Sequence, residues 1–230
     1  MRPEKLSPSA TARVPVFVSR NDRYFQDRYQ AIPRDGYTAL FKQRLDPPRI
    51  SVELDTEYKD ALLVVQHDRA VFAGPIDEFF DFAEGPLPYR SIRFEGRLEP
   101  GSFGLPVGTV NYPNELDFTR ISDRRHLSGR PDAKPLLFTD YPDAYAAGAN
   151  EPYYPIPSPA AAERLSRYLT VAATPDGRMF FAGRLGDYAY YNIDQASARA
   201  LALFKKRIVP IAIGGLVAGQ TGRSRIAVSG

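Results

Sequence analysis

The sequence contains no cysteine and no tryptophan, and it has no long apolar run. Without thiols the chain can form neither a disulfide bond nor a thiolate metal site. No stretch of about 18 apolar residues is present, so we expect no membrane-spanning helix. Residues 1–11 are polar and unlike a signal peptide. The two histidines, His67 and His126, lie too far apart for metal-ligand spacing. These absences favour a cytoplasmic protein.

An excess of charge of one sign is also missing. Thirty basic residues face 27 acidic ones, which leaves a net charge of +3. Proteins that bind nucleic acid usually carry a basic stripe or a recognisable module, and this sequence has neither. The small basic surplus suits an anionic small ligand instead. Apolar residues make up 43%, with 14 Tyr and 14 Phe, which is enough to bury a core.

The pattern of apolar residues predicts a mixture of helices and strands. Helical spacing or helix-start residues mark four segments, namely 36–45, 75–82, 158–169 with Ser158 as N-cap, and 193–206. Short apolar or alternating runs predict strands at 14–18, 50–54, 61–65, 70–73, 89–98, 107–112, 117–122, 135–138 and 179–182. A run of strands with helices between and around them favours an α+β fold, with a mostly antiparallel sheet, flanking helices and no Rossmann unit.

The chain divides into three predicted regions. Residues 1–13 form an N-terminal tail, residues 14–206 a ligand-binding domain, and residues 207–230 a C-terminal tail that could serve as an interface segment. The glycine-rich run GGLVAG at 214–219 lacks the G-x-G-x-x-G spacing of a dinucleotide-binding turn, and eleven residues follow it. That length cannot hold the helix, second strand and acidic ribose partner of such a unit. The apolar C-terminal tail favours a homodimer.

Seven motifs occur in a set order along the chain. They read NDRYFQDRYQAIPRDGYT at 21–38, GPIDEFF at 74–80, YRSIRFE at 89–95, VNYP at 110–113, FTRI at 118–121, EPYYP at 151–155 and FAGRLGDYAYYNID at 181–194. This series resembles the UDP-galactopyranose mutase family from about residue 14 to residue 206. The resemblance implies a mutase-like nucleotide-sugar-binding domain and an isomerase that interconverts pyranose and furanose forms. Family members begin with a βαβ unit that binds FAD, whereas the motifs here start beyond it, so we expect a chain without the FAD-binding region and without FAD.

The expected site is a cradle for a nucleotide-diphosphate sugar. Breaking the bond to the anomeric carbon places negative charge on the diphosphate, which arginine and tyrosine side chains can stabilise. The resemblance implies diphosphate contacts from Tyr24, Arg120, Tyr154, Arg184, Tyr188 and Tyr190. The predicted catalytic residues are Arg120, Arg184, Tyr190 and Asp194. The predicted substrate-binding residues are Tyr24, Arg28, Tyr154, Tyr188, Tyr191 and Asn192.

Two positions depart from the family pattern. Phe17 stands where the family has an arginine, and Arg20, Arg23 or Arg28 could substitute for it. Asn192 stands where the family has an acidic residue, and an amide cannot act as a carboxylate. The nearest replacements are Asp187 and Asp194.

Without a flavin, stabilisation of the leaving group must supply more of the catalysis. We therefore expect a divalent cation, Mg²⁺ or Mn²⁺, on the diphosphate, with oxygen ligands that the sequence does not assign. The anomeric carbon could be attacked by an enzyme carboxylate or, as we favour, by the sugar's own 4-hydroxyl.

The base and the sugar stay open at this stage, because the family's base-stacking region lies in the part that this chain lacks. In its reduced size the chain is similar to a flavin-independent GDP-L-galactose mutase of nucleoside-antibiotic pathways, which favours a GDP-sugar. The alternatives are a non-catalytic nucleotide-sugar-binding protein or one half of a split FAD-dependent mutase. Apart from the resemblance, the tyrosines are more typical of packing aromatics than of binding residues, and Arg120 and Arg184 are more typical of surface ion pairs.

Overall fold

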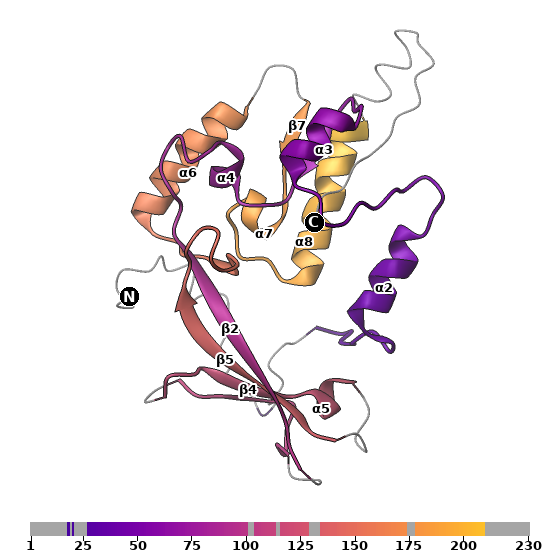
Figure 1. Cartoon of the computed structure of the whole chain (residues 1–230), viewed down its shortest axis with the longest axis vertical. Helices are drawn as coiled ribbons and strands as arrows, with labels where there is room; N and C mark the ends of the chain where they lie inside the picture. Colours follow the sequence, from indigo (N-terminus) through magenta and orange to yellow (C-terminus); the bar gives the residue numbers. More distant parts are fainter. Residues whose placement is uncertain are drawn as a thin grey trace. The chain divides into compact units, whose positions relative to one another are not determined.

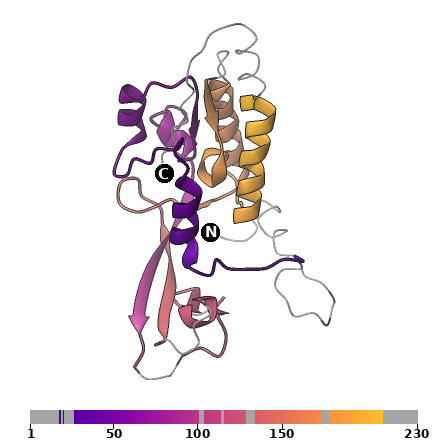
Figure 2. The same ribbon diagram turned by 90° about the vertical axis from the view of Figure 1, so that its right-hand side faces the viewer.

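The computed structural model describes residues 18, 20, 27–100, 104–113, 116–128, 134–173 and 178–209 (Figures 1 and 2). The chain forms two compact units. Among the described residues, the first unit contains 45–89 and 154–209, and the second contains 18–44 and 90–153. Because the second unit interrupts the first in sequence, the first unit is closed by segments that lie far apart along the chain.

A parallel pair of short strands lies inside the first unit. Strand β1 (Ala70–Phe72) pairs with β7 (Met179–Phe181), with Phe72 opposite Phe181. Helices surround this pair, with α6 and α8 on opposite sides of β7 in the view of Figure 1. They are α3 (Tyr58–Val64), α4 (Ile76–Phe79), α6 (Pro159–Ala172), α7 (Gly183–Gly186), α8 (Ile193–Leu203) and the π-helical turn η2 (Phe204–Ile208). Because two strands alone are at best marginally stable in water, the pair depends on packing against these helices.

Aromatic rings from the GPIDEFF segment fill the core of this unit. The ring centroid of Phe79 lies 5.1 Å from that of Phe72 and 5.0 Å from that of Phe181. Phe80 packs against Phe181 at 5.6 Å and stacks on Tyr168 at 5.9 Å. Tilted and edge-on ring contacts of this kind add to the free energy gained from burying the rings. The short helix α4 therefore serves to deliver two adjacent phenylalanines to β1 and β7.

Two predicted strands of the first unit are wrong. Residues 61–65 belong mostly to helix α3, and residues 50–54 have no regular structure. The backbone bonds at 61–65 are local, since Ala61 N–H donates to Glu57 (3.0 Å) and Val65 N–H donates to Ala61 (2.8 Å). A strand needs a neighbouring strand to satisfy its backbone groups, and among the described residues this segment has none. A short apolar run cannot by itself distinguish the two structures.

The second unit contains an antiparallel sheet. Four described strands of this unit follow the order β3-β4-β5-β2, and β2 and β5 run alongside each other in both views (Figures 1 and 2). They are β2 (Tyr89–Leu98), β3 (Thr109–Asn111), β4 (Arg120–Asp123) and β5 (Leu136–Ala144). The next strand in the order, β6 (Tyr154–Pro155), belongs to the first unit. Helices α2 (Gly36–Leu45) and α5 (Arg124–Ser128) belong to the second unit. The described residues thus confirm the α+β class, with a mostly antiparallel sheet and no Rossmann unit.

Several predicted elements agree with the structure in detail. The helix at 36–45 and the strand at 89–98 have the predicted bounds. Ser158 caps α6, because its Oγ accepts a hydrogen bond from Ala161 N–H at 3.1 Å. The predicted tail at 1–13, the strand at 14–18 apart from Val18, and the run at 214–219 lie outside the described residues. No described helix is long and apolar enough to cross a membrane.

The hydroxyl of Tyr188 joins three loops of the first unit. Its oxygen lies 2.6 Å from the carbonyl oxygen of Pro88 and 3.1 Å from that of Ile156, and it is the donor. Ile156 N–H also donates to Pro88, at 3.0 Å. Tyr188 is 8% exposed and has a φ of 49°. Burial raises the pKa of its phenol, which keeps the donating proton in place.

Asp77 stabilises the same junction through hydrogen bonds with residues at and just before the start of β2. Its carboxyl group is 1% exposed and accepts hydrogen bonds from Leu87 N–H at 2.8 Å and from the Tyr89 hydroxyl at 3.2 Å. The ring of Tyr89 in turn contacts that of Tyr188 edge-on, with the centroids 5.2 Å apart. Burial raises the pKa of Asp77. The carboxyl group therefore orients the residues that lead to Pro88.

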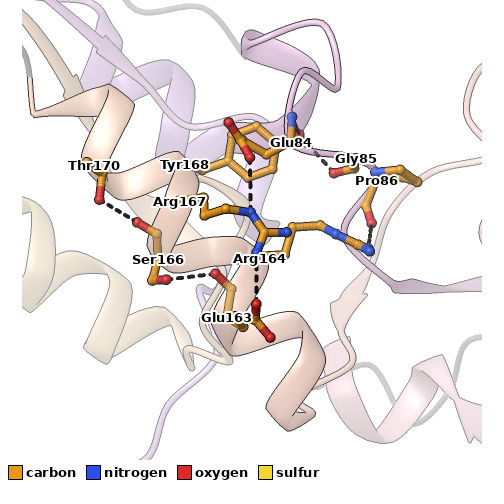
Figure 3. A network of polar contacts seen from close by, with 9 residues as sticks. All are labelled: Glu84, Gly85, Pro86, Glu163, Arg164, Ser166, Arg167, Tyr168 and Thr170. Carbon is orange, nitrogen blue, oxygen red and sulfur yellow. Dashed lines mark hydrogen bonds and ion pairs between the residues drawn. The ribbon is translucent and has the colours of Figure 1, made fainter.

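Helix α6 holds the same loop through side chains on one of its faces (Figure 3). The Tyr168 hydroxyl donates to the Gly85 carbonyl at 2.8 Å, and Arg167 pairs with Glu84 at 3.0 Å. Arg164 donates to the Pro86 carbonyl. These positions share a helix face because they are three and four residues apart. The loop that precedes Pro88 thus contacts α6 at three consecutive residues, Glu84, Gly85 and Pro86.

A buried ion pair closes the end of β4 in the second unit. Asp123 is fully buried, and its carboxylate accepts hydrogen bonds from the Arg125 guanidinium at 2.8 Å and from Leu105 N–H at 3.1 Å. The hydrogen bonds from Arg125 lower the pKa of Asp123 to about 2. Ionised Asp123 therefore stabilises the folded state.

We predict that Tyr188→Phe lowers the free energy of unfolding by about 1–3 kcal/mol, because the carbonyl groups of Pro88 and Ile156 lose the hydroxyl that donates to both, and Pro88 keeps the N–H of Ile156 as a donor. Urea denaturation followed by circular dichroism measures the change. The control is Tyr29→Phe, since Tyr29 is 81% exposed and should change stability by no more than about 0.5 kcal/mol. Equal stability of the two variants would contradict this role for the Tyr188 hydroxyl.

We also predict that the stabilisation from Asp123 depends on pH. Its folded-state pKa is about 2, below the ordinary 3.8, so its contribution is present above pH 4 and is lost as the pH falls toward 2. Asp123→Asn should cost about 1–3 kcal/mol at pH 7 and less at pH 3. Urea denaturation at pH 7, 5 and 3 tests this, with the exposed Asp117→Asn as control. A stability difference between wild type and variant that does not narrow at pH 3 would refute it.

Candidate functional site

One segment of the first unit carries most of the predicted site residues. It begins at Gly183, two residues after the end of β7, and runs through α7 to the start of α8. Gly183 has a φ of +93°, and a Cβ atom there would lie 3.6 Å from Ala73. A φ of this sign strains any residue except glycine, so Gly183 allows the sharp turn that carries Arg184 away from the strand.

Arg184, Tyr154 and Tyr190 come together and form what we call the arginine–tyrosine cluster. The two tyrosine rings are stacked, with centroids 4.8 Å apart and planes inclined by 6°. The Arg184 Cζ lies 5.2 Å from the Tyr154 centroid and 4.9 Å from the Tyr190 centroid. Its Nη2 donates to the carbonyl of Tyr191 at 2.6 Å. All three side chains are partly exposed.

This arrangement places a cation beside two phenol groups at a partly exposed position. Attraction between a guanidinium and aromatic faces limits the orientations that the arginine can adopt. A planar guanidinium matches phosphate oxygens well, and its hydrogen bonds to them are charge-assisted. The cluster can therefore bind an anionic group such as a phosphate.

The other predicted residues of this segment have different surroundings. Tyr188 is buried, with its hydroxyl donated to backbone carbonyls. Tyr191 lies half-buried beside the cluster, and burial raises the pKa of its phenol. Asn192 caps α8 in a capping box with Gln195, whose Oε1 accepts from Asn192 N–H at 2.9 Å. Asp194 is exposed in the first turn of α8, where a carboxylate favours the helix dipole.

The remaining predicted residues belong to the second unit or lie outside the description. Arg120 Nη1 lies 3.7 Å from the carboxylate of Asp140, and its Nε donates to Asn111 Oδ1 at 3.3 Å. Burial raises the pKa of Asp140. The guanidinium of Arg28 lies 5.2 Å from the ring centroid of Tyr29. Tyr24 is outside the described residues.

Sequence reasoning missed Arg199, which contacts this segment from α8. Its guanidinium forms an ion pair with Asp187, the residue that follows α7, at 2.8 Å. One signal could have pointed to it, because Arg199 is the one basic residue in the helical sequence IDQASARALAL.

The described residues offer little to an expected cofactor. They contain no group of three or more His, Asp or Glu side chains that could hold a metal ion. They also do not fit the pyrophosphate of a flavin dinucleotide, because β1 and β7 each lead into a helix of four residues. A Cβ atom on Gly74 would lie 2.6 Å from the Phe72 ring, so this glycine serves internal packing. A dinucleotide turn instead opens the start of a longer helix to the ligand.

Known proteins similar to this chain are named as nucleotide-sugar mutases. It is 32% identical over 207 residues to a "Probable UDP-galactopyranose mutase" of Klebsiella pneumoniae, covering 87% of this chain and 52% of that protein. It is 30% identical over 217 residues to a UDP-galactopyranose mutase of Mycoplasma pneumoniae (86% and 53%). It is 28% identical over 208 residues to a dTDP-fucopyranose mutase of Escherichia coli (87% and 55%). The chain spans about half the length of these curated relatives.

The family comparison covers more of the chain than any one motif. The model of the family described as UDP-galactopyranose mutase matches residues 1–190. This range includes Tyr154, Arg184 and Tyr190, the three members of the arginine–tyrosine cluster. The relatives and the family model agree with the resemblance in the ordered motifs, and on this evidence the chain belongs to the UDP-galactopyranose mutase family.

Proposed function

We propose that this chain binds a nucleotide-diphosphate sugar and interconverts its pyranose and furanose forms. The arginine–tyrosine cluster is the observation that carries the proposal, because it presents a cation and two phenols to an anionic group. Membership of a family whose relatives are named for UDP-galactopyranose and dTDP-fucopyranose supports the choice of a sugar diphosphate as that group.

The proposed reaction begins with the break of the bond between the anomeric carbon and the diphosphate oxygen. The bonding electrons go to the diphosphate, whose growing charge Arg184 stabilises by charge-assisted hydrogen bonds. The sugar's 4-hydroxyl then attacks the anomeric carbon and loses its proton, which gives a bicyclic anhydro sugar. When the diphosphate attacks the same carbon again, the old ring oxygen leaves and takes up a proton. The overall change is an isomerisation that consumes no oxidant and no reductant.

The residues have distinct roles in this proposal. Arg184 and the hydroxyls of Tyr154 and Tyr190 bind the diphosphate, and exposed Asp194 accepts the proton of the 4-hydroxyl. Tyr188 holds the loop through its buried hydroxyl. For five other residues the predicted role in the site still rests on the family resemblance, namely Tyr24, Arg28, Arg120, Tyr191 and Asn192.

We propose a GDP-linked sugar such as GDP-L-galactose as the substrate, and a route that uses no flavin. The names of the relatives include both a UDP-sugar and a dTDP-sugar, so the base varies within the family and needs its own assay. The ion pair between Asp187 and Arg199 supports attack by the 4-hydroxyl over attack by this carboxylate. A carboxylate engaged by a guanidinium is a weaker nucleophile than a free one.

The direct test is incubation of the purified protein with GDP-L-galactose, other GDP-sugars and UDP-galactose, with and without Mg²⁺ or Mn²⁺, followed by anion-exchange chromatography and NMR of the products. We expect a furanose product without added flavin. Binding without any change of ring size would favour a non-catalytic binder. Turnover that requires FAD, a reductant and a second chain would favour one half of a split enzyme.

We predict that Arg184→Gln lowers kcat by a factor of about 10²–10³, because one donor to the developing charge is lost. Arg184→Lys should recover only part of the rate, since an ammonium cannot bind phosphate through a planar fork. Arg97→Gln is the matched control, because Arg97 is 78% exposed in the other unit. Steady-state kinetics of the three variants would refute the role of Arg184 if all three rates equal the wild-type rate.

We predict that a divalent cation bound to the diphosphate is needed for full activity. Such a cation supplies charge stabilisation to the leaving group. Treatment with EDTA should reduce turnover strongly, and added Mg²⁺ or Mn²⁺ should restore it. Full turnover in chelator would count against the cation.

The expected homodimer stays a prediction that light scattering can check.

A further inference from the structure

The ion pair between Asp187 and Arg199 lies at the C-terminal end of α7, the short helix that carries Arg184. The Arg199 guanidinium reaches both carboxylate oxygens of Asp187, with Nη2 at 2.8 Å from Oδ1 and Nε at 3.1 Å from Oδ2. The same Oδ2 accepts a hydrogen bond from Gly183 N–H at 3.1 Å. Asp187 N–H donates to the Gly183 carbonyl at 2.9 Å. Asp187, the residue that follows α7, thus binds both backbone groups of Gly183, the first residue of α7, and Arg184 lies between the two residues.

This carboxylate is a potential competitor for Arg184. Arg184 and Asp187 are three residues apart across a helical turn, a spacing at which side chains of opposite charge can pair. The Asp187 side chain is 15% exposed, so water screens its charge only weakly. The charge also acts near the site, because it adds to burial in raising the pKa of the Tyr191 phenol. An unpaired Asp187 would therefore attract the Arg184 guanidinium away from the tyrosine rings.

We propose that Arg199 is a positioning residue that pairs with Asp187 and so prevents this carboxylate from drawing Arg184 away from the Tyr154 and Tyr190 rings, where it would bind the diphosphate. The proposal rests on the proposed function only in naming diphosphate as the anion. The guanidinium groups of Arg184 and Arg199 and the carboxylate of Asp187 carry charges that sum to +1. Arg199→Gln reduces the sum to zero, whereas Arg199→Gln with Asp187→Asn returns it to +1. A purely structural ion pair predicts no such recovery in the double variant.

Two measurements test this proposal. The first is isothermal titration calorimetry with pyrophosphate, GDP and UDP. We expect Arg199→Gln to bind at least about tenfold more weakly than wild type, from the loss of one nearby charge, and the double variant to recover most of the affinity. The matched control is Arg97→Gln, which removes the same charge and one ion pair at an exposed position of the other unit and should leave affinity unchanged.

The second measurement needs no ligand. In a crystal structure of Arg199→Gln we expect the Arg184 guanidinium to contact Asp187, and in the double variant to lie over Tyr154 and Tyr190 as in the wild type. If Arg184 keeps its place in Arg199→Gln, or if the double variant binds as weakly as the single one, the proposal is wrong. If wild type binds no diphosphate at all, the proposed function fails, while the position of Arg184 in the crystals still decides the role of Arg199.

Discussion

The buried hydroxyl of Tyr188 is the contact on which the first unit's candidate site depends. One donor group meets the carbonyls of Pro88 and Ile156, which are 100 and 32 residues away in sequence. A buried polar group without a partner is costly, so this arrangement strongly favours one relative position of the three loops. Tyr154 precedes Ile156 by two residues and Tyr190 follows Tyr188 by two, so the same contact brings the stacked rings together.

Charged groups of both signs lie around the arginine–tyrosine cluster. Arg184 lies over two rings and holds the Tyr191 carbonyl, while the nearby carboxylate of Asp187 is engaged by Arg199. A cation that is held in orientation before the ligand arrives requires little rearrangement when charge develops on a leaving group. The proposed isomerisation suits such a site, because in that route the same anion is stabilised twice, once as it leaves and once before it returns.

Local sequence signals predicted several elements correctly. Ser158 before Pro159 indicated the start of α6, whose cap is a local contact, and the alternation at 89–98 indicated β2, whose pairing with the distant β5 the sequence does not show. The apolar run at 61–65 was misread as a strand, because Leu63 and Val64 lie on an exposed helix face and composition does not reveal whether a neighbouring strand is present. Arg199 was missed for a similar reason, since its partner is chosen in space rather than by spacing.

By itself the sequence determined the family, the α+β class and the residue types from which an anion cradle could be built. Ordered motifs carry that information because each fits a local backbone requirement, such as the glycine at position 183. Only the tertiary structure decided how the tyrosines are used: Tyr188 faces inward to two carbonyls, whereas Tyr154 and Tyr190 stack beside Arg184. Identical phenol groups acquire these different roles because burial and hydrogen-bond partners come from loops that are distant in the chain.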